Sequence, residues 1–159
     1  MKHLTEYITE KLRINTKTLE YKYFPKTKDE LKKILLEKLD KDKNADLNDI
    51  DVSEITDMNK LFVGLDPHNI TISLWDVSNV KDMSFMFSGC KNFNSDLSNW
   101  DVSNVKFMEY MFDQCTKLDF DLSKWNPAKA LGTYKEFMFN GCISLEDKNK
   151  PYWYDETFE

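Results

Sequence analysis

A repeat of 25 residues is the feature of this sequence that most restricts its fold. Trp75, Trp100 and Trp125 lie 25 residues apart, and WDVSNVKDMSFMF at 75–87 recurs as WDVSNVKFMEYMF at 100–112. One unit of this length cannot bury its apolar side chains alone, so successive units must cover one another. The repeat therefore predicts a stack of similar coils rather than a globular core of distant segments.

Further copies lie on both sides of this pair. IDVSEITDMNKLF at 50–62 is an earlier copy with Ile50 in the Trp position, and MFNGC at 138–142 belongs to a later copy displaced by two residues. The added residues are expected in the stretch 126–133, whose Pro and Gly suit a longer loop. The units counted in this way are 50–74, 75–99, 100–124 and 125–150.

Each unit combines a stretch of helical spacing with a stretch of strand-like alternation. Apolar residues at i, i+3, i+7 and i+10, which would share one face of a helix, are Val80, Met83, Phe87 and Cys90. The Asp and Ser of the preceding DVS are typical helix N-caps, and 93–102 alternates as a short strand does. We therefore expect an α/β solenoid, a leucine-rich-repeat-like stack of about four 25-residue strand–helix coils.

The segments outside the repeat are expected to close its ends. Residues 1–49 are predicted to form a helical, α+β amino-terminal cap, and 151–159 a carboxy-terminal cap tail after the 50–150 repeat body. Within the first segment, Thr27 and Glu30 form a capping-box pattern before an amphipathic helix at about 28–39. An earlier helix is predicted from the apolar face made by Leu4, Tyr7, Ile8 and Leu12.

Charge and hydropathy exclude two classes of partner. Residues 50–159 hold 10 Lys/Arg and 18 Asp/Glu, a net charge of −8, whereas a nucleic-acid binder needs a basic stripe. No apolar run reaches the roughly 20 residues that span a bilayer. The first residues mix charged and apolar side chains, unlike a secretory signal. We expect no nucleic-acid or membrane partner and a cytoplasmic protein.

The residues that usually carry chemistry are sparse. Cys90, Cys115 and Cys142 share one repeat position, so we expect a ladder of buried thiols; a zinc site would need four ligands. His3 and His68 are distant in sequence, and with only four Gly there is no phosphate-binding loop. The chain is expected to be no enzyme, with no catalytic residue, cofactor or metal.

The segment 40–51 partly matches a calcium-binding loop. The acidic and amide side chains at loop positions 1, 3, 5 and 7 are Asp40, Asp42, Asn44 and Asp46. However, Ala45 stands where the sharp turn needs Gly, and Asp51 stands where the bidentate Glu belongs. We therefore interpret the segment as a polar linker into the repeat.

The strand-like stretches supply a candidate binding surface. If Leu97 and Leu122 face inward, alternation sends the neighbouring Asp and Ser side chains outward. Stacking would align them into an acidic, hydroxyl-bearing face for a protein with a basic surface, or into a face that is only solvated. Phe120 replaces Ser95 of the previous unit, either in the core or as an exposed anchor. The candidate partner-binding residues are Asn94, Asp96, Ser98, Asp119, Phe120, Asp121 and Ser123.

The pattern WDVSNVxxMxxMFxxCxxFNxDLSxW, over residues 50 to about 150, resembles the BspA-like bacterial surface repeat, known also from mycoplasma-type lipoproteins. That resemblance implies a divergent leucine-rich repeat used in adhesion and protein binding. Because the secretion signal of surface members is missing, we expect a monomeric protein-binding module inside a bacterial cell, such as a phage or mobile-element protein that masks a host protein in the host cytoplasm.

Two alternatives remain open. The first dozen residues are similar to short leaders that send internal proteins to the heads of tailed phages, which would make this a packaged or structural protein of the virion interior. The other alternative is a cell-surface adhesin whose leader is missing.

Overall fold

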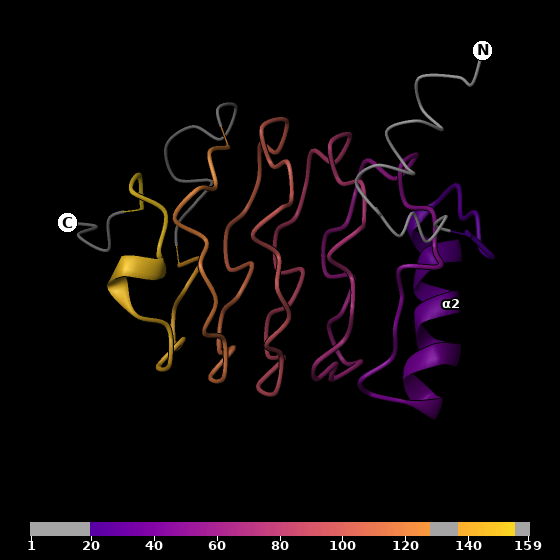
Figure 1. Ribbon diagram of the computed structural model, residues 1–159, viewed down its shortest axis with the longest axis horizontal. Coiled ribbons are helices and arrows are strands. Elements are labelled where there is room, and N and C mark those ends of the chain that lie inside the picture. Colours follow the sequence, from indigo (N-terminus) through magenta and orange to yellow (C-terminus); the bar gives the residue numbers. More distant parts are fainter. Residues whose placement is uncertain (1–19, 128–136, 155–159) are drawn as a thin grey trace, which may run out of the picture.

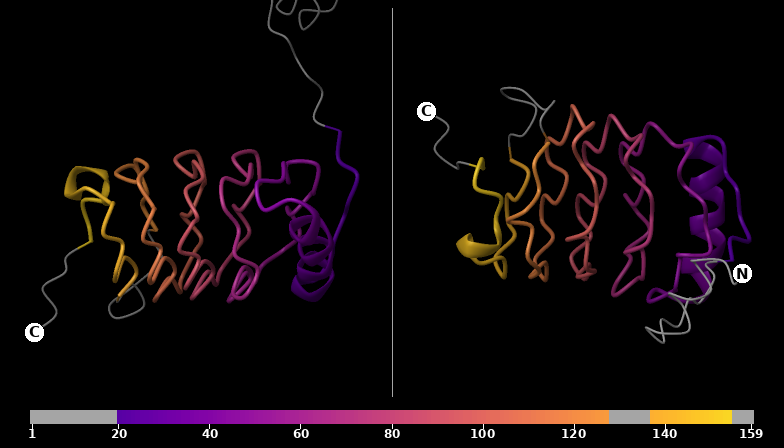
Figure 2. Two further views of the ribbon diagram at one scale, coloured as in Figure 1. Left: turned by 90° about the horizontal axis from the view of Figure 1, so that it is seen from below. Right: turned by 45° about the horizontal axis from the view of Figure 1, so that its top comes forward.

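The chain forms similar coils that follow one another along the long axis of the molecule (Figure 1). A computed structural model describes residues 20–127 and 137–154. The helices in these ranges are α2 (Lys28–Lys41), which covers one end of the stack, and the 3-10 helix η2 (Asp147–Asn149), near the other end (Figures 1 and 2). The helix predicted on residues 1–12, most of the predicted 126–133 insertion and the last part of the 151–159 tail lie outside the described residues.

The predicted α/β solenoid of leucine-rich-repeat-like strand–helix coils is wrong. Outside α2 and η2 the described residues contain neither helix nor strand, only isolated parallel bridges between coils, such as Asp57 to Asp82 and Asp82 to Phe107. Each coil is instead a succession of tight turns in which an N–H group bonds the carbonyl three residues earlier. In one coil such bonds run from Val105 to Val102 (3.0 Å), Met111 to Met108 (3.2 Å) and Cys115 to Phe112 (3.0 Å).

These turns explain why the sequence imitates a helix. The first and fourth residues of a turn face inward and the two between them face outward, so apolar residues recur every three or four positions. Val77 and Val80 are buried at the ends of a turn closed by a 2.9 Å hydrogen bond, whereas Asn79 between them is exposed. The same spacing defines the apolar face of a helix. The predicted inward residues are therefore buried although the predicted backbone is wrong.

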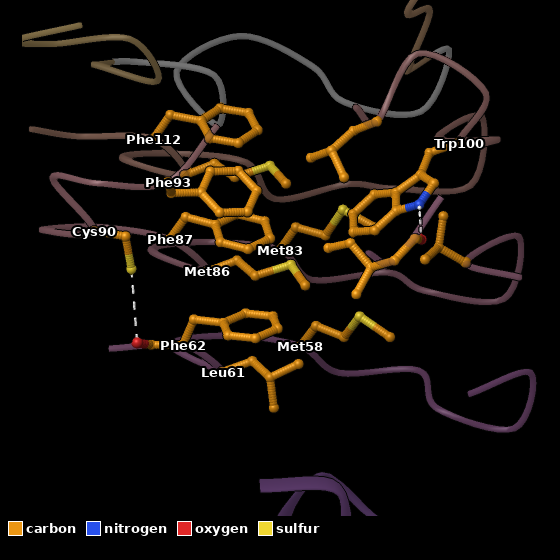
Figure 3. Close-up of a cluster of buried hydrophobic side chains, with 14 of the residues drawn as sticks. Met58, Leu61, Phe62, Met83, Met86, Phe87, Cys90, Phe93, Trp100 and Phe112 are labelled. Carbon is orange, nitrogen blue, oxygen red and sulfur yellow. Dashed lines mark hydrogen bonds between the residues drawn. The ribbon is translucent and has the colours of Figure 1, made fainter. Parts of the chain in front are cut away.

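Adjacent coils are joined by backbone hydrogen bonds and by stacked rings. The N–H groups of Met83, Phe85 and Phe87 donate to carbonyls of the next coil at 2.9, 3.0 and 2.9 Å. Inside the stack, the rings at one repeat position are nearly parallel, with centroids 4.8, 5.6 and 5.7 Å apart (Figure 3). This core column consists of Phe62, Phe87, Phe112 and Phe139. Each ring pair contributes about 0.5–1.5 kcal/mol beyond the burial of its surface.

The repeated tryptophans tie each coil to the preceding one. Trp75, Trp100 and Trp125 stack with centroids 6.4 Å apart. Their indole Nε1–H groups donate to backbone carbonyls 28 residues earlier, at 2.9, 3.1 and 3.0 Å, and Figure 3 shows the bond made by Trp100. A buried indole N–H needs such a partner, so Trp serves both apolar packing and inter-coil bonding.

Helix α2 covers the apolar end of the first coils. The predicted helix at about 28–39 is confirmed, and the Thr27 hydroxyl accepts the Glu30 N–H at 3.2 Å as an N-cap. The Glu30 carboxylate accepts from Lys26 N–H (2.7 Å), one residue before the position expected in a capping box. The leucines of α2 that are buried in the common core are Leu31, Leu35 and Leu39.

Truncating one core ring is expected to destabilise the whole stack. Phe112 is 0% exposed and lies between Phe87 (5.6 Å) and Phe139 (5.7 Å). Phe112→Ala should lower the free energy of unfolding by about 3–5 kcal/mol, a large share of the roughly 5–15 kcal/mol of a typical domain. Urea titration of both proteins measures this, with the exposed Lys124→Ala as control. An unchanged midpoint for Phe112→Ala would contradict the stacked core.

Candidate binding surfaces

Two of the predicted binding residues are exposed carboxylates fixed by local turns. Asp96 and Asp121 occupy the same position of consecutive coils. Their Oδ1 atoms accept the backbone N–H groups of Ser98 and Ser123, both at 2.9 Å. The two serines are half-buried, so the structure exposes the acids more fully than the hydroxyls. Because the turn holds each carboxylate, little side-chain freedom remains to be lost on binding.

A second row of aspartates, not predicted as a binding feature, lies after the tryptophan-bearing turns. Asp51, Asp76 and Asp101 each accept the N–H of the serine two residues later, at 3.0 Å. Their DVS motif was interpreted as a helix N-cap, and in fact it makes the same kind of aspartate turn as the first row. We call the two rows together the acidic corner; its residues are Asp51, Asp76, Asp96, Asp101 and Asp121.

Hydrogen bonds favour the charged form of two carboxylates of this corner. The side chain and then the backbone N–H of Ser123 hold the pKa of Asp121 below its ordinary value, and Ser103 does the same for the pKa of Asp101. Within 20–127 and 137–154, none of the five carboxylates forms an ion pair. The acidic corner therefore presents two rows of carboxylates that no ion pair among the described residues neutralises, with Lys124 as a cation near Asp121.

The other predicted residues lie in a groove or toward the core. Asn94 and Asp119 line a polar groove of about 400 Å³ together with His68, and the Asn94 side chain accepts the Asp119 N–H at 3.0 Å. Phe120 is half-buried and packs edge-on against Phe93, with ring centroids 6.4 Å apart. The structure thus places Phe120 against the core, where the smaller Ser95 of the previous coil is buried.

A row of rings on another turn of the coil was missed by sequence reasoning. Phe85 and Tyr110 stack with centroids 4.9 Å apart, Tyr110 and Phe137 follow at 5.1 Å, and the Lys60 ammonium lies 5.3 Å from the Phe85 centroid. Phe137 is 42% exposed. We call Lys60, Phe85, Tyr110 and Phe137 the aromatic row. Its sequence signal is an aromatic residue directly before Met-Phe in three successive units.

The backbone of the aromatic row is strained. Lys60, Phe85, Tyr110 and Phe137 all have left-handed φ angles, between 54° and 57°. For residues other than glycine this conformation costs roughly 1–2 kcal/mol each. Phe85 has this conformation without being glycine. Four residues later in the same coil, the next left-handed position is occupied by Gly89 (φ 78°). Because strained positions cluster at binding sites, the row is a second candidate surface.

The thiols are not nucleophiles. Cys90, Cys115 and Cys142 are free and buried, as predicted, and their Sγ atoms donate to phenylalanine carbonyls of the preceding coil at 3.6, 3.1 and 3.0 Å (Figure 3 shows Cys90). Burial, aided by Asp66, raises the pKa of Cys90 to about 12. Burial likewise raises the pKa of Cys115. Cys90 and Cys115 therefore remain neutral at physiological pH, and all three side chains pack as small buried groups.

The described ranges contain no group of three or more side chains arranged to hold a metal ion. In the predicted polar linker at 40–51, Asp42 and Asp46 accept the backbone N–H groups of Asn44 (2.8 Å) and Asn48 (3.0 Å), so these carboxylates stabilise turns. No helix in the described part of the chain combines the length and apolar character needed to cross a bilayer.

The buried thiols should make stability fall at alkaline pH. A thiol whose pKa is raised on folding stabilises the protein fully below its unfolded pKa, and loses that contribution as pH rises toward the folded value. For Cys90 this window runs from 9.0 to about 12, and each such thiol lowers the unfolding free energy by about 1.4 kcal/mol per pH unit within its window. Urea unfolding between pH 7 and pH 11 measures this slope.

The matched control replaces Cys90, Cys115 and Cys142 together with Ala. This variant should be less stable at pH 7, because it loses packing, but its stability should fall less steeply above pH 9.0, the ordinary thiol value. Equal slopes in the two proteins would show that the thiols ionise as freely in the folded state as in the unfolded one.

One family model matches most of the chain. The family described as "Mycoplasma protein of unknown function, DUF285" matches residues 30–153, from the first turn of α2 to the last described coil. Comparisons with curated proteins and with solved structures gave no match. The matched region includes most of α2, the acidic corner and the aromatic row. Since it covers well over half of the chain, this protein belongs to the DUF285 family of mycoplasma proteins of unknown function.

Proposed function

We propose that this chain is a non-enzymatic module that binds a partner protein with a basic surface through the acidic corner. The observation that carries the proposal is the pair of in-register aspartate rows, each carboxylate fixed by the N–H of a serine two residues later. Repeat proteins bind through faces of this kind because one position per coil builds an extended surface.

The electrostatics of the corner favour a cationic partner. Residues 50–159 have a net charge of −8, with 10 Lys/Arg against 18 Asp/Glu. Carboxylates that lack ion-pair partners within the described residues add their fields at the surface. Such a field speeds encounter with a positive surface and weakens as salt rises, and it contributes more to association than to lifetime.

The cellular setting of this binding is part of the proposal. The sequence pattern resembles the BspA-like repeat, which implies protein binding. We propose that the module acts as a monomer in a bacterial cytoplasm, as a phage or mobile-element protein that masks a host protein would. The packaged virion alternative depends on the first dozen residues, which lie outside the described ranges.

Family membership favours one second candidate, a cell-surface adhesin. The matched family consists of mycoplasma proteins, and mycoplasma-type lipoproteins carry repeats that this sequence resembles. Protease treatment of intact producing cells separates the two settings: an adhesin is digested, whereas an intracellular module survives until the cells are lysed.

Neutralising the acidic corner is expected to slow association with the partner. The partner is first captured from producing cells with the tagged chain and identified by mass spectrometry. Asp96→Asn with Asp121→Asn keeps the oxygen that closes each turn and removes two charges. The association rate constant, measured by surface plasmon resonance at 50 mM and 300 mM salt, should fall by on the order of tenfold at low salt and much less at high salt.

The control removes the same charge elsewhere. The control variant is Glu37→Gln with Asp40→Asn. Both residues are exposed on α2, the helix that covers one end of the stack. This variant should change the rate constant less than twofold. If both double variants slowed association equally, the overall negative charge, and not the acidic corner, would account for the effect. A salt-independent rate, unchanged in the corner variant, would contradict the proposal.

A further inference from the structure

We propose that the aromatic row, with the carboxylates of Glu109 and Asp113 beside it, binds an arginine-bearing segment of a partner protein. The row lies on the turn between Met108 and Met111, whereas the acidic corner flanks the turn between Leu122 and Trp125. The inference therefore goes beyond the proposed function and stands even if the acidic corner binds nothing.

The row already accommodates a cation within the chain. The Lys60 ammonium lies 5.3 Å from the centroid of Phe85, within the range of a cation–π contact. Phe85 and Tyr110 are nearly parallel (9°) with centroids 4.9 Å apart, and both side chains are only half-buried, so part of each ring is exposed. A second flat cation can cover that part of the row as Lys60 covers its first ring.

Among the described residues, the carboxylates beside the row have no ion-pair partner. Glu109 directly precedes Tyr110, and its Oε2 atom is buried with no hydrogen-bond partner. Asp113 accepts only neutral donors, of which the Asn140 side-chain amide (2.7 Å) is nearest. Asp57 on the same side of the stack, by contrast, is bonded to the Lys28 ammonium at 2.6 Å. We assign the complementary charge at Glu109 and Asp113 to a cation of the partner protein.

A second buried polar side chain without a hydrogen-bond partner in the described ranges lies one coil earlier and also favours a polar ligand here. Ser84 occupies the position of Glu109 one coil earlier, is 3% exposed, and its Oγ atom also has no hydrogen-bond partner among the described residues. Buried polar atoms without partners are destabilising. A multi-donor cation that bonds the accessible part of the half-buried Glu109 carboxylate offsets part of the cost of burying that charge, in addition to any attraction at the surface.

Size and geometry define the occupant. The row extends over steps of 5.3, 4.9 and 5.1 Å, which matches four to five residues of extended peptide at about 3.3 Å each. A folded partner or a second copy of this chain would need roughly 800 Å² on each side for a stable interface. Arginine fits better than lysine, because its planar guanidinium stacks on rings and bonds a carboxylate with two parallel N–H groups.

The test uses the full chain and defined peptides of eight residues, alternating Arg with Ser, Lys with Ser, or Glu with Ser. Nuclear magnetic resonance titration should give a dissociation constant on the order of 10⁻⁴ M for the arginine peptide. The lysine peptide should bind several-fold more weakly, and the glutamate peptide not at all. The amide signals that shift should include Phe85 and Tyr110.

Variants locate the peptide on the row. Glu109→Gln with Asp113→Asn preserves shape and should weaken the arginine peptide at least tenfold, and Tyr110→Leu should do so by a similar factor. Glu37→Gln with Asp40→Asn, on α2, should change binding less than twofold. Thermal midpoints verify that each variant is folded, and the isosteric double variant decides the question if Tyr110→Leu unfolds.

Several outcomes would overturn the inference. These are no binding at 1 mM peptide, equal binding of the arginine and lysine peptides, and loss of binding in Asp96→Asn with Asp121→Asn but not in the row variants. A dimer in sedimentation that Tyr110→Leu dissociates would assign the row to a second copy instead. The acidic corner is tested by the association rate of the captured partner and the aromatic row by the peptides, so the two proposals fail separately.

Discussion

The contact between one coil and the next is the interaction on which the rest of this structure depends. Within a coil, turns such as Met108 to Met111 fix the shape but bury almost nothing by themselves. Burial comes only when Phe87 meets Phe112 and when the Trp100 indole donates to the Ile72 carbonyl of the neighbouring coil. Stability is therefore shared along the axis, and the helix α2 is needed where the axis begins because the first coil has no predecessor.

The same inter-coil register governs the surface. A side chain that points outward in one coil is repeated outward in the next, so charge at Asp96 is followed by charge at Asp121 and a ring at Phe85 by a ring at Tyr110. Local hydrogen bonds then fix the aspartates, while stacking offsets part of the backbone strain under the rings. Both candidate surfaces thus follow from packing rules that also build the core.

Sequence reasoning predicted which apolar residues are buried better than it predicted the backbone conformation. Met83, Phe87 and Cys90 are buried as expected, and the α2 helix begins beside Thr27 as its capping pattern indicated. The strand–helix coil was wrong because consecutive turns and a helix place apolar residues at the same spacing. When every turn begins and ends with an apolar residue, the sequence alone does not distinguish consecutive turns from a helix.

For the candidate sites too, the sequence predicted some residues correctly and missed others. Asp96 and Asp121 were found by alternation, but Phe120 lies against Phe93, since one bulky ring can fill the space beside a small neighbour. The aromatic row escaped because a left-handed corner normally calls for glycine, and Phe85 and Tyr110 give no local hint of that conformation.

The identity of consecutive coils has an evolutionary consequence. Duplication of a single 25-residue unit, such as the one from Trp75 to the residue before Trp100, would insert a coil that finds its hydrogen-bond and ring partners already in place on both sides. The same event would add one aspartate to each of the two rows of the acidic corner and one ring to the aromatic row. Copy number could then adjust the reach of both surfaces in single genetic steps, without any change to the contacts that hold the existing coils.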